Sequence, residues 1–206
     1  MDTFEFNSLN LRLMHAYKTE YPTAELWIAE LGYRLFPDDA WWATQYGAAA
    51  FNVGLDLYAE RALLHAHPKR DKNRERVEWI LGQVYQHQGR FDEAEKWYRM
   101  ATATAPQKTG PWVYLGCFLA NRERFREACE VLEQGLHAEG DVDEVYYNLG
   151  LNKRTLNDLE GAKKCFESAL AITPDYTLAE FHVRDIDEAL RIRREFAQFA
   201  DQAALQ

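Results

Sequence analysis

The sequence of 206 residues contains very little serine, and this absence argues against several enzyme classes at once. Only Ser8 and Ser168 are present, and Ser168 lies within a segment predicted to be helical. The chain has no glycine-rich phosphate loop, no H-E-x-x-H metal motif and no G-x-S-x-G nucleophile motif. We therefore expect a protein that is not an enzyme, with no catalytic residues and no cofactor.

Cysteine and histidine are also scarce and poorly spaced for metal binding. Cys117, Cys129 and Cys165 have neither the spacing of zinc ligands nor that of a redox pair. His65 and His67 are two residues apart, so in a helix they point to different sides. We expect no metal site, and we interpret the cysteines as small apolar residues in helices, as is usual in a reducing compartment.

Long hydrophobic runs and a large excess of positive charge are missing as well. The N-terminal stretch 1–6 has no basic region and no apolar run, so we expect neither export nor membrane insertion, and a cytoplasmic location. The formal net charge of −9 argues against nucleic acid as a partner. The basic segment 69–76 is a local exception, which we interpret as a solvated loop, with contact to an acidic partner as the alternative.

The sequence does contain a repeat. Hydrophobic residues make up 47% and charged residues 28% of the chain, as in a folded protein. A pattern of large and small residues recurs three times with a period of 34, in blocks 75–108, 109–142 and 143–176. Each block has a Leu-Gly pair, then an alanine, then a large residue and finally a proline or glycine. These positions are Leu81-Gly82, Ala94, Tyr98 and Pro106, then Leu115-Gly116, Ala128, Leu132 and Gly140, then Leu149-Gly150, Ala162, Phe166 and Pro174.

Each element of this pattern has a packing role. The glycine lets the two helices of a hairpin approach each other where they cross, the alanine keeps their seam thin, and the large residue fills the gap one turn later. The pattern resembles that of the tetratricopeptide repeat (TPR) family, whose signature is W-x-x-L-G-x-x-Y, then A-x-x-x-F, then P. The resemblance implies an all-α fold, a right-handed αα superhelix, and a function as a scaffold that binds other proteins.

Weaker versions of the pattern flank the three blocks. Segment 40–74 is predicted to be a degenerate repeat, since Gly47 and Leu63 fall on the expected positions. Segment 1–39 is predicted to be an N-terminal degenerate helical pair, and 177–206 a C-terminal amphipathic helix with a tail. We therefore predict one solenoid of about five helix-turn-helix units, closed by the C-terminal helix.

Local signals predict helix ends and helix faces. A carboxylate of the pair Asp38-Asp39 is expected to cap the helix that follows, and Asp141 with Glu144 resembles a capping box. The C-terminal helix is predicted to run from about Leu178 to Phe199. One of its stripes is expected to dock on the last repeat: Ala179, Val183, Ile186, Leu190 and Ala197. A second stripe on roughly the opposite side offers an alternative function, self-association: Phe181, Ile192, Phe196 and Phe199.

In the family that the chain resembles, the first helices of the repeats line a concave groove. The matching positions here combine aromatic, apolar and amide side chains, which favour an apolar or aromatic peptide or helix as the ligand: Trp41, Gln45, Trp79, Gln83, Tyr114, Cys117, Tyr147, Asn148 and Leu151. These positions lack the cations with which chaperone cofactors of this family grip a C-terminal carboxylate, so a tail of Hsp70 or Hsp90 is not the expected ligand. Two alternatives stay open. The aromatic side chains are packed between helices, or the protein is a dedicated chaperone like those of bacterial secretion systems.

Overall fold

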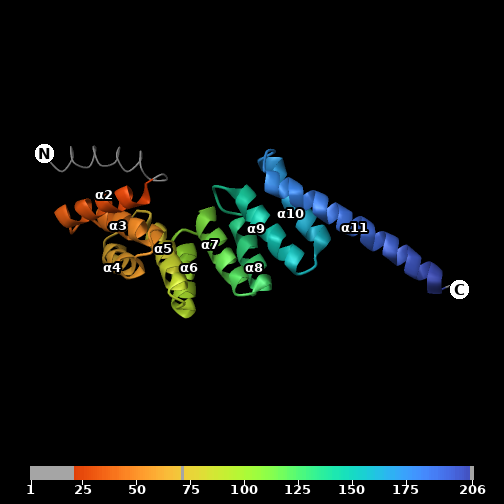
Figure 1. Cartoon of the computed structure of the whole chain (residues 1–206), viewed down its shortest axis with the longest axis horizontal. Helices are drawn as coiled ribbons and strands as arrows, with labels where there is room; N and C mark the ends of the chain where they lie inside the picture. The colour runs from red at the N-terminus through yellow and green to blue at the C-terminus, as the bar shows by residue number, and fades with distance from the viewer. Residues whose placement is uncertain (1–20, 71, 205–206) are drawn as a thin grey trace. The chain divides into compact units, whose positions relative to one another are not determined.

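The structure consists of helices joined by short turns. The computed structural model describes the backbone of residues 21–70 and 72–204, and the side chains of 21–70 and 72–197. Within these residues the chain forms ten α-helices, one 3-10 helix and no β-strand (Figure 1), which confirms the prediction of an all-α fold. The helices are α2 Pro22–Leu35, α3 Ala40–Asn52, α4 Asp56–Ala66, η1 His67–Lys69, α5 Arg74–His87, α6 Phe91–Thr104, α7 Thr109–Asn121, α8 Phe125–Gly135, α9 Val142–Thr155, α10 Leu159–Ile172 and α11 Thr177–Ala204.

The contacts divide the chain into two compact units. Unit 1 comprises Met1–Thr104 and contains α2 to α6, while unit 2 comprises Ala105–Gln206 and contains α7 to α11. The hairpin α3–α4 occupies the predicted block 40–74, and α5–α6, α7–α8 and α9–α10 occupy the three regular blocks. The first half of segment 1–39 lies outside the described residues, and α2 forms its second half. The grouping of these hairpins into a single solenoid stays a prediction.

The four hairpins share one turn geometry. A residue with positive φ stands two positions before each second helix: Gly54 at 79°, Gly89 at 75°, Glu123 at 59° and Asn157 at 62°. The next residue donates its backbone N–H five residues back, as Arg90 does to the carbonyl of Tyr85 at 2.8 Å. This Schellman-type closure satisfies carbonyl groups that the helix end would otherwise leave unpaired. Glycine adopts the left-handed conformation without strain, so the glycines account for two of the turns, whereas Glu123 and Asn157 are held there by the surrounding hairpin.

The seam inside each hairpin has the predicted construction. A methyl group on Gly82 would lie 2.7 Å from the ring of Tyr98, and one on Gly150 would lie 2.8 Å from the ring of Phe166. Both rings are buried. The same relation repeats with Leu132 and Leu63 as the large partner in the other two hairpins. Close packing of a bare backbone against a large side chain is therefore what holds the two helices of each hairpin together.

In unit 1 the core between α2 and α3 is built around Trp42, whose side chain is completely buried. Ile28, Ala29 and Ala49 form a cluster with it, and Gly32 leaves the space that its ring occupies. Trp41 packs edge-on against this ring at 4.7 Å between ring centroids. The first described hairpin is thus attached to α2 by one large aromatic side chain.

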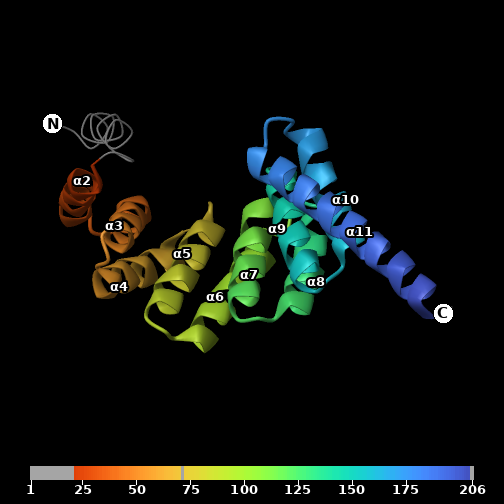
Figure 2. The same ribbon diagram turned by 45° about the vertical axis from the view of Figure 1, so that its right-hand side comes forward.

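In unit 2 the last hairpin packs against α11. Ala179 and Ile186 are buried in a cluster with Phe166, and Val183 and Leu190 are half-buried beside them. Ala197 is exposed, so its predicted place in the docking stripe is wrong. Apolar docking ends at Leu190, and Arg193 still donates to the side-chain oxygen of Asn157 at 3.0 Å. The helix continues to Ala204, beyond the predicted end at Phe199, and Figures 1 and 2 both show its last part extending past α10. Phe199 has no described side chain.

The two predicted caps have different outcomes. Asp39 is the N-cap of α3, and its carboxylate accepts a hydrogen bond from the backbone N–H of Trp41 at 2.8 Å, as predicted. Asp141 is the N-cap of α9 but makes no side-chain cap, so the predicted capping box is wrong. The backbone N–H of Asp141, which Glu144 would have bound, donates instead to the Thr109 hydroxyl at 3.1 Å.

The three cysteines are free thiols inside unit 2. Cys129 and Cys165 are buried and Cys117 is half-buried, in agreement with their interpretation as apolar residues. Burial raises the pKa of Cys117 and Cys129 to about 11 and also raises the pKa of Cys165. These thiols are therefore packed and protonated at neutral pH.

Candidate interaction surfaces

The histidines that could bind a metal ion make structural contacts instead. His65 lies 2.9 Å from the carbonyl of Pro37, while His67 lies 3.0 Å from the buried carboxylate of Glu78 and packs edge-on against Trp97. The two histidines thus have separate partners. The described part of the chain contains no cluster of His, Cys, Asp or Glu that could hold a metal ion. It also contains no helix that is both long and apolar enough to cross a membrane.

In unit 1 the predicted groove residues lie on α3 and α5. Gln45 is buried, and Trp41 is half-buried against the Trp42 cluster, so both contribute to the packing of α3. Trp79 and Gln83 are half-buried on α5. The packing alternative therefore describes α3 better than an open groove does.

In unit 2 the predicted residues come together on α7 and α9. The Cys117 thiol donates to the side-chain oxygen of Asn148 at 3.3 Å and thereby joins the two helices. Tyr147 stacks on Tyr176 with 4.9 Å between ring centroids, and Leu151 packs against the same cluster. Tyr114 is half-buried on α7. These helices present a continuous set of half-buried aromatic, apolar and amide side chains.

This surface continues onto α11 through His182, which the sequence analysis missed. Arg154 donates to Nδ1 of His182 at 3.0 Å, so the other ring nitrogen, Nε2, carries the proton and faces the Tyr147 hydroxyl at 3.4 Å. Partial burial, together with Arg154, lowers the pKa of His182, while Asp185 opposes this effect. His182 is thus held neutral against Tyr147. The signal that could have found it is spacing, because α11 begins 34 residues after Asp143 and continues the period of the blocks.

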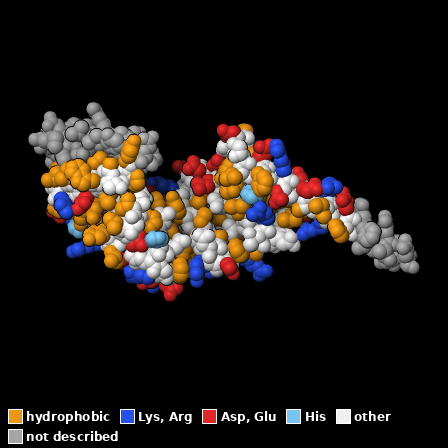
Figure 3. Space-filling view, in the orientation of Figure 1, with side chains coloured by type: hydrophobic (Ala, Val, Ile, Leu, Met, Phe, Trp, Pro, Cys, Tyr) orange, Lys and Arg blue, Asp and Glu red, His pale blue; other side chains and the backbone are white. Residues whose placement is uncertain are grey.

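Exposed apolar side chains adjoin His182. Phe181 is 62% exposed with its ring 5.5 Å from that of His182, and Leu178, one turn earlier, is 56% exposed. We call Tyr114, Cys117, Tyr147, Asn148, Leu151, Leu178, Phe181 and His182 the unit 2 groove, after the concave groove that the sequence predicts. Figure 3 shows hydrophobic side chains over the start of α11.

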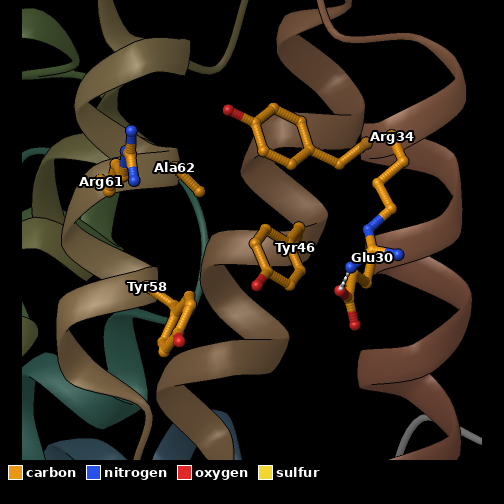
Figure 4. A pocket seen from close by; sticks show the side chains of 7 residues that line it. Glu30, Arg34, Tyr46, Tyr58, Arg61 and Ala62 are labelled. Carbon is orange, nitrogen blue, oxygen red and sulfur yellow. Dashed lines mark ion pairs between the residues drawn. The ribbon is translucent and has the colours of Figure 1, made fainter.

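A second aromatic surface lies among α2, α3 and α4 in unit 1. The helices enclose an open cleft of 370 Å³, and we call it the tyrosine cleft. Its lining residues are Glu30, Tyr33, Arg34, Tyr46, Tyr58, Arg61 and Ala62. Figure 4 shows that Tyr46 projects from α3 between Tyr58 and Arg61 of α4 and the Glu30–Arg34 ion pair of α2. The cleft residues were not predicted from the sequence.

A third exposed apolar surface lies on the part of α11 beyond Leu190. Ile192 is 42% exposed and Phe196 is 72% exposed. Both lie beyond Leu190, where apolar packing on α10 ends. The helix there is supported by ion pairs of Arg191 with Glu188 and Glu195 and by the hydrogen bond from Arg193 to Asn157.

The hairpins and surfaces define the class of protein, which is an all-α repeat protein of stacked helical hairpins. Family models of the tetratricopeptide repeat match residues 80–111 and 143–176. These two segments are tetratricopeptide repeats. Members of this family serve as scaffolds for protein interaction.

Solved structures of similar fold extend over most of the chain. MamA from Desulfovibrio magneticus RS-1 has a TM-score of 0.65 at 16% identity and covers 83% of this chain and 94% of its own. A thermophilic TPR protein of Thermus thermophilus has a TM-score of 0.68 at 16% identity, and the match covers 88% of this chain and 97% of that protein's chain. YrrB, described as a TPR protein with an unusual peptide-binding site, has a TM-score of 0.60 at 19% identity, and the match covers 89% of this chain and 92% of the YrrB chain. No curated protein sequence matches the chain.

Proposed function

We propose that the protein is a non-enzymatic interaction scaffold that binds an apolar or aromatic peptide or helix in the unit 2 groove. The observation that carries this proposal is the exposure of Phe181 and Leu178 beside the Tyr147–His182 contact. Exposed apolar side chains that continue a rigid, half-buried aromatic surface are typical of protein contact sites. The described peptide-binding site of YrrB, which shares the fold, adds support. The cytoplasmic location rests on the sequence alone.

Charge in the groove argues against a carboxylate ligand. Glu144 lies on α9 beside the groove, and partial burial together with Asp141 and Asp143 raises its pKa. Arg154, the nearby cation, already donates to His182 and lies 3.9 Å from Asp185. An incoming carboxylate would therefore meet an acidic cluster and a guanidinium that already has two partners. An apolar anchor suits the site better.

The groove predicts a loss of binding when Phe181 is shortened. A displayed library of 12-residue peptides is selected on the wild-type protein, and the dissociation constants of the enriched peptides are measured by fluorescence polarisation. We expect Phe181→Ala to raise the dissociation constants of peptides that bind in the groove by about 30-fold. This corresponds to about 2 kcal/mol of binding free energy, as is typical when an interface anchor is removed. Ile172→Ala is the matched control, because Ile172 is 52% exposed at the end of α10. Equal affinities for wild type and Phe181→Ala across all selected peptides would contradict the groove.

A second candidate function is self-association through α11. Ile192 and Phe196 leave an apolar stripe on a helix that extends past its support. The docked half, 177–190, contains four acidic residues and one arginine, whereas 191–204 contains three arginines and two acidic residues. An antiparallel pair of α11 helices would place the acidic half of one copy beside the basic half of the other. This charge arrangement favours a second copy as the partner.

Self-association predicts a change of mass when the stripe is made polar. We expect the wild-type protein to elute with twice the chain mass in size-exclusion chromatography with light scattering, and Phe196→Glu to elute with the chain mass. The apolar contact would have to bury a carboxylate, whose desolvation is costly. Leu156→Glu is the control at an exposed leucine outside α11. A wild-type protein that elutes with the single-chain mass at high concentration rules out this function.

A further inference from the structure

The tyrosine cleft arises from one substitution in the repeat pattern. In the regular blocks a leucine precedes the seam glycine, and Leu81, Leu115 and Leu149 are at most 2% exposed. In block 40–74 this position is Tyr46. A tyrosine is too large and too polar for the space of a buried leucine, and Tyr46 is half-buried. Its ring stacks on Tyr33 of α2 with 5.4 Å between centroids and 18° between planes.

Apart from the Glu30 carboxylate, which is ion-paired with Arg34, the polar groups of the cleft can donate hydrogen bonds. Burial, followed by the nearby Glu30, raises the pKa of Tyr46, so its hydroxyl keeps its proton at neutral pH. Tyr33 and Tyr58 contribute two more hydroxyl groups to the lining. A ligand that presents carbonyl oxygens, such as a peptide backbone, would find partners there.

The cleft also has one unmatched positive charge. Arg34 is ion-paired with Glu30 at 2.7 Å. Arg61 is exposed, and no residue in the described part of the chain forms an ion pair or a hydrogen bond with it. A guanidinium at the edge of an aromatic cleft can bind a carboxylate with two parallel hydrogen bonds.

Apolar side chains surround the cleft on both sides. On α2, Trp27 is 65% exposed and lies three residues before Glu30, on the same helix face. On α4, Leu57 is 76% exposed and Leu64 is 41% exposed, four residues before and three after Arg61. Figure 3 shows hydrophobic side chains gathered over α2 to α4. This concentration of exposed apolar area is typical of a contact site.

We propose that the tyrosine cleft binds a protein segment in which an aromatic or aliphatic anchor stands next to an aspartate or glutamate. The anchor packs among the tyrosine rings, the tyrosine hydroxyls donate to the segment's backbone carbonyls, and Arg61 binds the carboxylate. This site lies within unit 1 and is separate from the unit 2 groove. Its preference for acidic residues is also opposite to that expected of the groove, which lies beside Asp141, Asp143 and Glu144.

The test uses peptide selection on two charge states of the cleft. A displayed library of random 12-residue peptides is selected on the full chain carrying Phe181→Ala, so that the unit 2 groove contributes little. We expect enrichment of an acidic residue next to an aromatic or aliphatic one. Selection on Phe181→Ala with Arg61→Glu should instead enrich basic residues beside the anchor. Failure to enrich any peptide, or enrichment of the same sequences on both proteins, overturns the proposal.

Affinities of the enriched peptides assign the site. We expect Arg61→Glu to lower the affinity of the enriched peptides by about tenfold or more, because the positive charge that binds their carboxylate is replaced by a negative one. Arg126→Glu makes the same change of net charge at an exposed arginine of α8 and is expected to leave the affinity unchanged. Tyr46→Leu restores the residue of the regular blocks and should abolish binding while the chain keeps its helical circular dichroism. Unchanged binding to Tyr46→Leu or to Arg61→Glu overturns the proposal, whatever the unit 2 groove binds.

Discussion

Replacement of Trp42 by alanine is expected to lower the free energy of unfolding of unit 1 by about 3–5 kcal/mol, the cost of deleting a large buried aromatic side chain. Trp42 is completely buried, and its ring lies between Gly32 and Trp41. Because Gly32 has no side chain, the part of α2 that lies against the ring could not fill the cavity. A whole domain has a stability of only about 5–15 kcal/mol, so α2 should separate from α3.

The measurement should resolve the two units. Repeat proteins often unfold in parts, so amide hydrogen exchange followed residue by residue is preferable to a single melting curve. We expect faster exchange in α2 and α3 of Trp42→Ala and unchanged exchange in α9 and α10. Trp27→Ala is the control, since Trp27 is 65% exposed and its removal should cost about 0.5 kcal/mol or less. Similar losses for both tryptophans would contradict the assigned core.

Gly150→Ala is expected to destabilise unit 2 by about 1–3 kcal/mol, the usual cost of overpacking a filled core. The added methyl group would lie 2.8 Å from the Phe166 ring, which is completely buried. The ring cannot yield, because Tyr147 lies 5.7 Å and His182 lies 4.8 Å from it, measured between centroids. Displacement of the Phe166 ring should therefore also weaken the packing of α11 on α10.

Gly110→Ala provides the same chemical change without the clash. A methyl group on Gly110, in the first turn of α7, would have no atom within 4 Å. Alanine is a better helix former than glycine, but the following Pro111 disfavours the helical conformation for a residue with a side chain, so we expect this variant to change the free energy of unfolding by less than about 1 kcal/mol. The difference between the two variants can be read from urea unfolding followed by circular dichroism. An equal loss for Gly110→Ala and Gly150→Ala, or a gain for Gly150→Ala, would show that the seam is not limited by space.

The seam could be predicted because each block contains both of its partners, the glycine and the large residue that packs on it. Gly82 and Tyr98 are small and large at fixed spacing, and the same relation recurs one period later. The capping box at Asp141 could not be judged in this way. Its N–H binds Thr109, 32 residues away, and a local pattern says nothing about such a distant partner. The end of α11 was missed for a related reason, because ion pairs of Arg191 carry the helix beyond its apolar support.

The candidate sites were less predictable than the fold. The family's groove positions place Cys117 and Asn148 on facing first helices, where their side chains are in contact, and their role in binding stays a prediction. Gln45 was assigned to an open groove by the same positions, yet its side chain is buried, since the α2–α3 core differs from that of the regular blocks. Tyr46 was not predicted because it departs from the pattern, and His182 because the groove positions were not carried onto α11, although α11 continues the period of the blocks. Departures from a repeat, and not only the positions that match it, are therefore places to look for binding residues.

The packed thiols have a practical consequence for labelling. Because the pKa of Cys117 and Cys129 is raised to about 11, only about one in ten thousand of these thiols is ionised to the thiolate at pH 7. The hairpin tips at Glu123 and Asn157 are exposed. A cysteine introduced at either tip would react with a maleimide dye or a spin label far faster than the native thiols. Probes can thus be attached at equivalent points of successive hairpins while the native cysteines stay in place.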